Sequence, residues 1–255
     1  MNRLSPAVLG LVIANIAVFV AGMLIPQGNE WLIAKGAFWF PDNANSAVWQ
    51  FVTYMFLHGT VGHIFFNMFG LVSFGVLLEQ QWGTRRFLLF YFLCGIGAAL
   101  IHLGVELYHF HILQERLVAH GLTPADINAL LARFDEGFPG EEPVNPDFGE
   151  LYRIYAGPML GASGAIYGVL VAFGLLYPNA RLAVMFVPIP VAAKIVIPVL
   201  LALDLLSGVT GFSIFGGGVA HFAHLGGAFI GFILMLFWRR GRGQRPDELP
   251  TTTVS

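Results

Sequence analysis

Polar side chains occur in pairs inside three apolar stretches of the sequence, with the members of each pair three or four residues apart. The pairs are His63 and Asn67, Ser163 and Tyr167, and His221 and His224. Residues at this spacing lie on the same side of a helix, so each pair predicts one polar helix face. Because polar groups are expensive in hydrocarbon, such faces are expected to point into a cavity or toward another helix.

Ser163 and a histidine could together perform acyl transfer. A serine hydroxyl becomes an effective nucleophile when a base removes its proton, and histidine is the usual base. The reaction also needs donors for an oxyanion, for which His63, Asn67 and a backbone N–H at a helix start are suitable. Gly161 and Gly164 fit a sharp entry into a helix at Ser163, which would place such an N–H there.

Helical spacing puts three of these groups at similar depths in a membrane. Ser163 and His224 each lie about 21 Å from the expected inner ends of their helices, and His63 lies about 24 Å from its own. In a hydrocarbon core roughly 30 Å thick, all three are then somewhat below the outer surface. The spacing is compatible with one site assembled from three helices, but it does not determine whether the three faces meet.

The composition is that of a membrane protein. Of 255 residues, 56% are hydrophobic and 11% are charged, and the mean hydropathy is +0.72. A soluble domain carries about 25% charged residues. The net charge of -2, with a single short basic run near the C-terminus, leaves no footprint for nucleic acid. The lone Cys94 excludes an intramolecular disulfide, and a Cys/His metal cluster is not expected.

Six stretches qualify, or nearly qualify, as membrane-spanning helices. They are residues 7–25, 61–78, 87–107, 154–177, 191–207 and 219–238. We predict an all-α membrane protein with a six-transmembrane-helix bundle over residues 1–245 and a disordered tail over 246–255. The first stretch is interpreted as a retained span, because it is long for the apolar part of a signal peptide. Cytoplasmic termini would put eight arginines inside, against four Lys and Arg residues outside.

Two segments between the spans are long. Residues 26–60 form a first outer loop whose aromatic content suits the membrane interface. Residues 108–153 form an acidic outer insert, whose first part could continue the third helix through Ala119. Thr123 and Pro124 then resemble a helix N-terminus, which predicts a helix to about Asp135.

Three further segments are predicted to be non-helical. Gly137–Glu150 is rich in Pro, Gly and acidic residues and is predicted to be a loop. Leu182–Pro190 contains two prolines and is predicted to be a bent connection. The segment from Gly157 to Gly161 is expected to dip into the membrane as non-helical backbone, which is tolerable where protein covers it or water reaches it.

The ordered set of motifs resembles the rhomboid family of intramembrane serine proteases. The motifs are Gly-x-Ser-Gly at 161–164 with Tyr167, Ala-His-x-Gly-Gly at 223–227, His-x-x-x-Asn at His63 and Asn67, and Gly-x-x-x-Glu-x-x-x-Gly at 75–83. Each short motif is weak alone, but their order over six predicted helices covers about residues 5–240. The resemblance implies a six-helix rhomboid-like fold.

The resemblance also implies roles for five residues. Ser163 would be the nucleophile and His224 the general base and acid, with the Tyr167 ring packed under the histidine. His63, Asn67 and the Ser163 N–H would stabilise the oxyanion. The substrates would be single-pass or multi-pass membrane proteins, cut in or near the outer end of a transmembrane helix. The implied partners are these substrates and the lipid bilayer, without cofactor or metal, and a bacterial inner membrane is the expected location.

The resemblance also concerns three segments outside the predicted spans. Relatives place the first outer loop partly in the membrane, and their fifth helix and the loop after it gate access. That loop is here Gly208–Gly218, which suits a mobile apolar cap. The chain has Trp49-Gln50 where many relatives carry Trp-Arg, which puts in doubt the polar contacts that anchor the first loop. The insert before the fourth helix is longer than in a minimal six-helix member.

Several polar residues are interpreted as structural. His221 is expected to cap its helix or line a cavity. Asp204 is interpreted as a cap or a water-facing group, although a carboxylate there could orient a histidine as in a triad. Glu79 is expected to be a structural acceptor at the inner end of the second helix. Close helix contacts are predicted at four glycines, namely Gly75, Gly83, Gly227 and Gly231.

Two other functions compete with proteolysis. A catalytically silent relative would bind transmembrane helices and escort or retain them, but such a role would not require both Ser163 and His224. A small channel or transporter could also use a polar cavity, but the sequence shows no inverted repeat.

Overall fold

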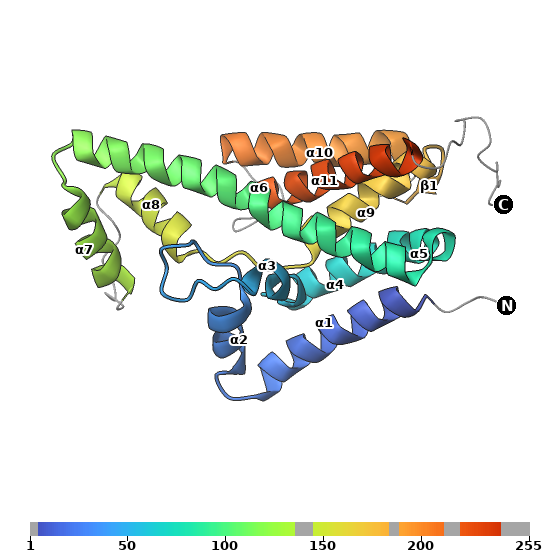
Figure 1. Ribbon diagram of the computed structural model, residues 1–255, viewed down its shortest axis with the longest axis horizontal. Helices are drawn as coiled ribbons and strands as arrows, with labels where there is room; N and C mark the ends of the chain where they lie inside the picture. Colours follow the sequence, from blue (N-terminus) through green and yellow to red (C-terminus); the bar gives the residue numbers. More distant parts are fainter. Residues whose placement is uncertain (1–4, 136–144, 184–188, 212–219, 241–255) are drawn as a thin grey trace.

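The computed structural model describes residues 5–135, 145–183, 189–211 and 220–240. Most of these residues are helical, and the helices form an elongated bundle (Figure 1). Among the described residues, five helical segments are long and apolar enough to cross a membrane. They are α1 (Pro6–Leu24), the continuous α4, η2 and α5 (Val61–Gly70, Leu71–Gly75 and Val76–Trp82), α6 (Thr84–Ala119), α10 (Ala193–Thr210) and α11 (His221–Arg240). The apolar helix α9 (Ser163–Leu176) is shorter.

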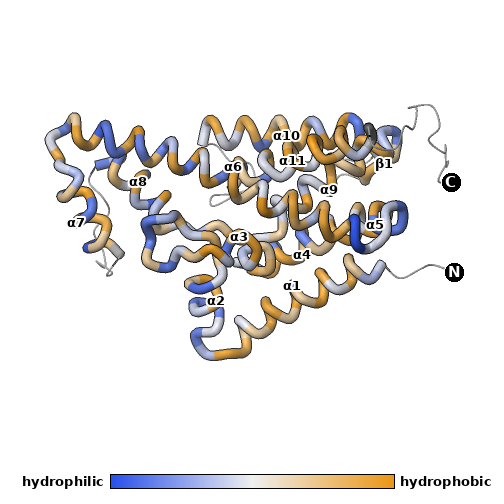
Figure 2. Tube along the Cα trace, viewed as in Figure 1, coloured by the Kyte–Doolittle hydropathy of each residue, from blue (hydrophilic) through white to orange (hydrophobic). Residues whose placement is uncertain are grey.

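The remaining elements are small. They are α2 (Gly28–Gly36), α3 (Gln50–Thr53), η1 (Tyr54–Phe56), α7 (Pro124–Asp135), α8 (Pro146–Ala156), β1 (Arg181–Leu182) and β2 (Val191–Ala192). The long helices are mostly apolar, and polar residues gather at α5, at α7 and at the end of α6 near α7 (Figure 2). Large apolar side chains such as Ile13 and Phe65 are exposed on the long helices, as expected of surfaces that face lipid.

The predicted fourth span, 154–177, is wrong at its start. Helix α8 ends at Ala156, and α9 begins only at Ser163. Pro158 has no N–H to continue a helix, and Gly161 has a φ of +121°, a backbone conformation that favours glycine. The prediction of non-helical backbone immediately before Ser163 is confirmed.

The all-α description needs a small correction near the fifth span. Strands β1 and β2 pair antiparallel, with Arg181 opposite Ala192 and Leu182 opposite Val191. The predicted bent connection is therefore a short hairpin, of which 184–188 lies outside the described residues. The predicted span 191–207 is shifted, because α10 begins at Ala193 and continues to Thr210.

Two predicted segments fall mainly where the structure gives no description. The start of the predicted apolar cap, Gly208–Gly218, is helical through Thr210, and its residues 212–218 lie outside the described residues. The predicted disordered tail, 246–255, lies outside them as well. Neither the mobility of the cap nor the disorder of the tail is tested.

Glu79 ties the start of α1 to the end of α5. The backbone N–H groups of Ala7 and Val8 each donate to its carboxylate at 2.9 Å, and the Thr84 hydroxyl donates to it at 2.7 Å. The first N–H groups of a helix have no partner within the helix, so a buried carboxylate satisfies them. The predicted role of Glu79 as a structural acceptor is confirmed.

Glycines allow α9 and α11 to lie in direct backbone contact. A Cβ atom on Gly227 of α11 would overlap the Gly164 carbonyl group of α9, and one on Gly231 would lie 2.7 Å from the Gly168 Cα atom. Small residues four apart on both helices permit this close approach. The contacts predicted at Gly227 and Gly231 are confirmed, and they fix the position of α11 against α9.

The other two predicted glycine contacts have different outcomes. A Cβ on Gly75 would lie 3.0 Å from the Phe87 ring, so this contact is confirmed. Gly83 was predicted as a contact point, and this is wrong: a Cβ on Gly83 would meet no other atom within 4 Å. Its φ of +82° instead lets the chain turn from α5 into α6.

The described part of the insert is helical: it consists of the outer end of α6 and of α7 and α8, which pack against it. Helix α6 has 36 residues and is therefore about 54 Å long, well beyond a hydrocarbon core of roughly 30 Å. Its outer part packs with α7 and α8 at the end of the molecule opposite α5 and β1 (Figure 1). A second apolar core forms there from Phe40, Phe110, Leu113, Leu117, Ile127, Leu131, Phe148 and Leu151.

Local sequence signals predicted one helix of the insert and missed the start of another. Helix α7 runs from Pro124 to Asp135, which confirms the predicted helix. The predicted loop Gly137–Glu150 is wrong from Pro146 onward, because α8 begins there; residues 136–144 lie outside the described residues. The Asn145 side chain accepts from the Asp147 N–H at 2.9 Å, an N-cap followed by proline that starts the helix.

Gln50 anchors the first outer loop. It is 1% exposed, and its Oε1 accepts from the N–H groups of Trp39 and Ala47 at 3.3 and 3.1 Å. Its Nε2 donates to the carbonyls of Asn45 and Lys35 at 2.7 and 3.4 Å. The amide thus provides the polar contacts that hold the first outer loop.

Candidate active site

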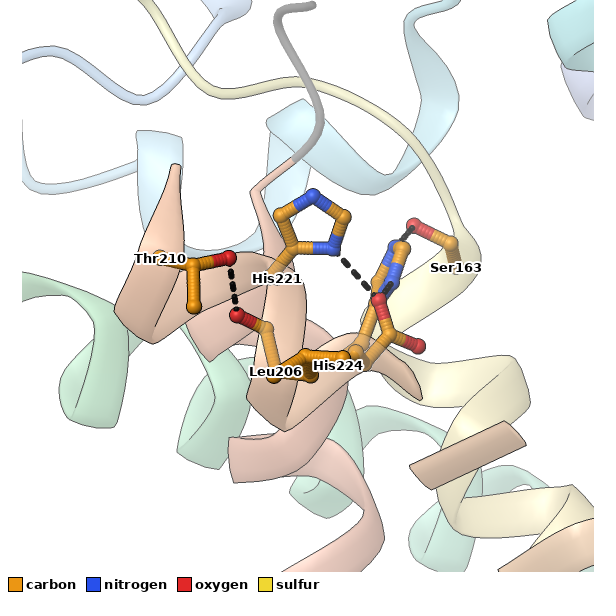
Figure 3. Close-up of polar contacts among 6 residues, drawn as sticks. Ser163, Leu206, Thr210, His221 and His224 are labelled. Atoms are coloured by element: carbon orange, nitrogen blue, oxygen red, sulfur yellow. Dashed lines mark hydrogen bonds and ion pairs between the residues drawn. The ribbon is translucent and has the colours of Figure 1, made fainter. Parts of the chain in front are cut away.

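Ser163 and His224 are in direct contact at the ends of two neighbouring helices. Ser163 is the first residue of α9, and His224 lies in the first turn of α11. The Ser163 Oγ and the His224 Nε2 are 2.8 Å apart, a hydrogen-bond distance (Figure 3). The glycine contacts between α9 and α11 set this register.

The Tyr167 ring stacks on the His224 imidazole. The ring centroids are 4.3 Å apart and the planes differ by 12°. Tyr167 is one helical turn after Ser163, so α9 presents a hydroxyl to one edge of the imidazole and an aromatic ring to its face. This packing restricts the rotation of the histidine.

The other ring nitrogen of His224 faces Asp204 of α10. The Asp204 Oδ1 lies 3.2 Å from His224 Nδ1 and 2.6 Å from His221 Nδ1. Asp204 is 4% exposed. The interpretation of Asp204 as a cap or a water-facing group is wrong, because its carboxylate is buried between two histidines from another helix. His221 was expected to cap or line a cavity, and it contacts this carboxylate.

Gly208 explains why α10 reaches the histidines. It lies four residues after Asp204 on the same helix face. A Cβ on Gly208 would be 3.2 Å from the Phe222 ring and 3.3 Å from the His221 Cβ, so the two helices approach closely. The end of α10 is further defined by the Thr210 hydroxyl, which donates to the Leu206 carbonyl at 2.7 Å (Figure 3).

His63 lies beside the backbone that leads into α9. A Cβ on Gly161 would be 2.7 Å from His63 Nε2 and 3.7 Å from Ser163 Oγ, so the glycine leaves room for the imidazole next to the serine. The N–H of His63 donates to the Thr60 hydroxyl, which caps α4. Asn67 is buried, and its Nδ2 donates to the His63 carbonyl at 2.9 Å.

His58 is a neighbour of the site that the sequence analysis did not select. Its ring lies 4.9 Å from that of His63, and it is 4% exposed. Both ring nitrogens of His58 are buried. Burial, together with the nearby His63, lowers the pKa of His58 to about 3. The residue lies in the loop before α4, where helical periodicity gives no signal.

One cluster among the described residues has the donor atoms of a metal site. The ligand atoms of Asp204, His221 and His224 all lie within 4.8 Å of one another. The separation of 2.6 Å between Asp204 and His221 is that of a hydrogen bond. Two ligands of a tetrahedral zinc ion with bonds of ~2.0 Å would be about 3.3 Å apart.

Comparison with known proteins identifies the family of this arrangement. Residues 45–133 and 141–241 match the Rhomboid domain. The chain belongs to the rhomboid family. Members of this family are generally serine intramembrane proteases that act on membrane proteins. The match includes Ser163, His224 and Asp204, and within the insert it covers the end of α6, α7 as far as Arg133, and α8.

Individual rhomboid relatives are distant in sequence. RHOMBOID-like protein 12, mitochondrial, of Arabidopsis thaliana is 29% identical over 92% of this chain and 59% of its own length. Rhomboid protease AarA of Providencia stuartii is 26% identical over 89% of this chain and 70% of its own length. Inactive RHOMBOID-like protein 8 of Arabidopsis thaliana is 33% identical, over 31% of this chain. The chain spans about half the length of several curated relatives that it matches.

Proposed function

We propose that the protein is an intramembrane serine endopeptidase that cleaves transmembrane helices near their outer ends. The observation that carries the proposal is the 2.8 Å contact between Ser163 Oγ and His224 Nε2, made by two apolar helices. A serine and a histidine at this distance can act as the nucleophile and base of covalent catalysis. Membership of the rhomboid family supports the same assignment.

In the proposed reaction, Ser163 Oγ attacks the scissile carbonyl carbon while its proton passes to His224 Nε2. The resulting tetrahedral intermediate collapses when His224 returns the proton to the leaving amine. Water then attacks the acyl-enzyme with His224 again as the base, which releases the second product and restores the serine. The residues present are sufficient for these steps, and the proposal includes no cofactor or metal.

The oxyanion of the intermediate would be stabilised at the start of α9. The Ser163 N–H lies at a helix N-terminus, where it has no partner within the helix and where the helix dipole favours negative charge. His63 and Asn67 are the proposed side-chain donors. The position of His63 Nε2 next to Gly161 supports its role. Asn67 Nδ2 donates one N–H to the His63 carbonyl, and its second N–H would be the donor to the oxyanion.

The proposed topology has six spans, with α9 as the short one, and cytoplasmic termini. The start of α1 and the end of α11 lie at the same end of the molecule, opposite α7 and α8, which supports this topology (Figure 1). A bacterial inner membrane is the proposed location. Ala129 is exposed on α7, and Cys94 is buried. An Ala129→Cys variant should therefore react with an impermeant maleimide in intact cells. A cysteine at this position that does not react would indicate the opposite orientation in the membrane.

Activity is tested with purified protein in proteoliposomes that also contain a helical membrane-protein substrate. We expect cleavage and labelling by a serine-directed fluorophosphonate, both abolished in Ser163→Ala and reduced by at least about 100-fold in His224→Ala. Cleavage that persists unchanged in Ser163→Ala would disprove the assigned nucleophile. A wild-type protein that retains a substrate helix without cutting or labelling would instead be a silent helix-binding rhomboid, in line with the relative named inactive.

A further inference from the structure

We infer that Asp204 is a positioning residue for His224, which extends the serine and histidine pair to a Ser163–His224–Asp204 triad supported by His221. The inference rests on the proposed function and concerns the same site. It assigns a role to a helix, α10, that contributes neither the nucleophile nor the base. The inference is carried by the distances in the site, the burial of the carboxylate and the chemistry of the imidazole ring.

The distances form a continuous chain of contacts. Ser163 Oγ is 2.8 Å from His224 Nε2, and His224 Nδ1 is 3.2 Å from Asp204 Oδ1. The two nitrogens of one imidazole thus face a hydroxyl on one side and a carboxylate on the other. This is the order of groups in a serine, histidine and aspartate triad, which is defined by geometry and not by sequence position.

The carboxylate selects the useful tautomer of His224. An ionised carboxylate accepts hydrogen bonds and cannot donate them, so the nitrogen that faces it must carry the proton. With the proton on Nδ1, the lone pair of His224 lies on Nε2, which is the nitrogen that contacts Ser163. Asp204 therefore holds His224 in the form that can remove the serine proton, and its negative charge stabilises the imidazolium that results.

The burial of Asp204 indicates that its carboxylate interacts with the histidines and not with water. An ionisable group inside an apolar helix is expensive unless it faces partners of its own. Asp204 lies 11 residues after the start of α10, too far to cap its N-terminus, and 4% of it is exposed. Its carboxylate contacts the Nδ1 atoms of His221 and His224. A carboxylate that served as a cap or faced water would not need this arrangement.

His221 supports the carboxylate from the other side. Its Nδ1 is 2.6 Å from the same Oδ1 atom that faces His224, so both histidines donate to one oxygen. His221 is 8% exposed, and among the described residues no hydrogen bond joins it to Ser163. Its hydrogen bond to Asp204 can therefore act on His224 by fixing the carboxylate, in addition to the edge-to-face contact of the two rings, whose centroids are 6.3 Å apart. Tyr167, which stacks on His224, also interacts with Asp204.

The test compares kcat and KM of variants in proteoliposomes with a helical substrate, together with the rate of fluorophosphonate labelling. Asp204→Asn should lower kcat and the labelling rate by about 100-fold or more, with KM within about 2-fold, because tautomer selection is lost while the binding surface is kept. Asp204→Glu should recover at least about 10-fold of the loss, because it restores a carboxylate. His221→Asn should lower kcat by about 10-fold.

Asp126→Asn is the matched control, since it makes the same chemical change at an exposed residue of α7 and should leave both rates unchanged. The thermal midpoint of each variant separates catalytic from folding effects. If Asp204→Asn does not fold, the comparison between Asp204→Glu and His221→Asn decides, because the inference requires both to be slower than wild type in kcat without a rise in KM.

Three results would overturn the inference. The first is an Asp204→Asn variant with kcat within about 3-fold of wild type. The second is an Asp204→Asn variant whose change appears only in KM or in the thermal midpoint, with no recovery in Asp204→Glu. The third is wild-type activity that a chelator abolishes and Zn²⁺ restores, which would assign the same donor atoms to a metal. A wild-type protein that neither cleaves nor labels would instead contradict the proposed function, and so the two failures are distinguishable.

Discussion

The Tyr167 ring lies almost parallel to the His224 imidazole, with 4.3 Å between their centroids. The two residues come from α9 and α11, the same pair of helices that supplies the serine and the histidine. Stacking on one face leaves the histidine free to use both ring nitrogens at its edge. The arrangement predicts that an aromatic ring, more than a hydroxyl, is needed at position 167.

Replacement of Tyr167 tests this relationship. Tyr167→Phe keeps the stacked ring and should retain activity within about 5-fold, whereas Tyr167→Ala should lose about 10-fold or more, because the imidazole gains rotational freedom. The measurement is kcat in proteoliposomes, with fluorophosphonate labelling as an independent readout. Equal activity of the alanine and phenylalanine variants would refute a positioning role for the ring.

A side chain at Gly227 should separate α9 from α11. A Cβ there would overlap the Gly164 carbonyl, so Gly227→Ala is expected to lower the free energy of unfolding by about 2 kcal/mol and to reduce cleavage. Gly10→Ala is the control, because no atom lies within 4 Å of the new Cβ and alanine is a better helix former. Unfolding midpoints and cleavage rates measure the two effects; an unaffected Gly227→Ala variant would contradict the close packing.

The Glu79 carboxylate should stabilise the protein without contributing to catalysis. Glu79→Gln removes the charge that two N–H groups of α1 contact and directs an amide N–H toward them, so the free energy of unfolding should fall by about 2 kcal/mol. Cleavage per folded molecule should stay the same, since Glu79 lies at the opposite end of α4–α5 from His63. Glu30→Gln, at an exposed residue of α2, should change neither quantity.

His58 should make the protein less stable as the pH falls. Its pKa in the folded protein is about 3, below the ordinary value of 6.5 that applies to the unfolded chain. Between these values the unfolded state binds the proton and the folded state does not. Stability associated with His58 is therefore fully present above pH 6.5 and decreases toward pH 3, by up to about 1.4 kcal/mol per pH unit.

The His58 effect is measured as a difference between variants, because carboxylates also contribute to acid unfolding. The free energy of unfolding of wild type should drop more between pH 7 and pH 5 than that of His58→Leu, in which the titrating ring is absent. His111→Gln is the control, since His111 is exposed on α6. The same pH slope in wild type and His58→Leu would show that His58 is accessible to protons in the folded state.

Local sequence patterns determined most of the helices and the catalytic pair that we propose. Apolar runs of membrane-spanning length predicted α1, α4–α5, α6, α10 and α11, because the bilayer imposes length and hydropathy on each helix separately. Thr123 and Pro124 predicted the start of α7 by the same local logic. The similar membrane depths predicted for Ser163 and His224 follow from helical rise alone, whereas their contact does not.

Tertiary structure decided how these helices meet. The carboxylate of Asp204 is 17 residues from His221 and 20 from His224 in the chain, and no local pattern reports that α10 brings it to 2.6 and 3.2 Å from them. The contact depends on the close approach of helices at Gly208, and the approach of Ser163 to His224 depends on Gly227 and Gly164. Such contacts join distant parts of the chain, so their energy depends on packing that only the folded bundle provides.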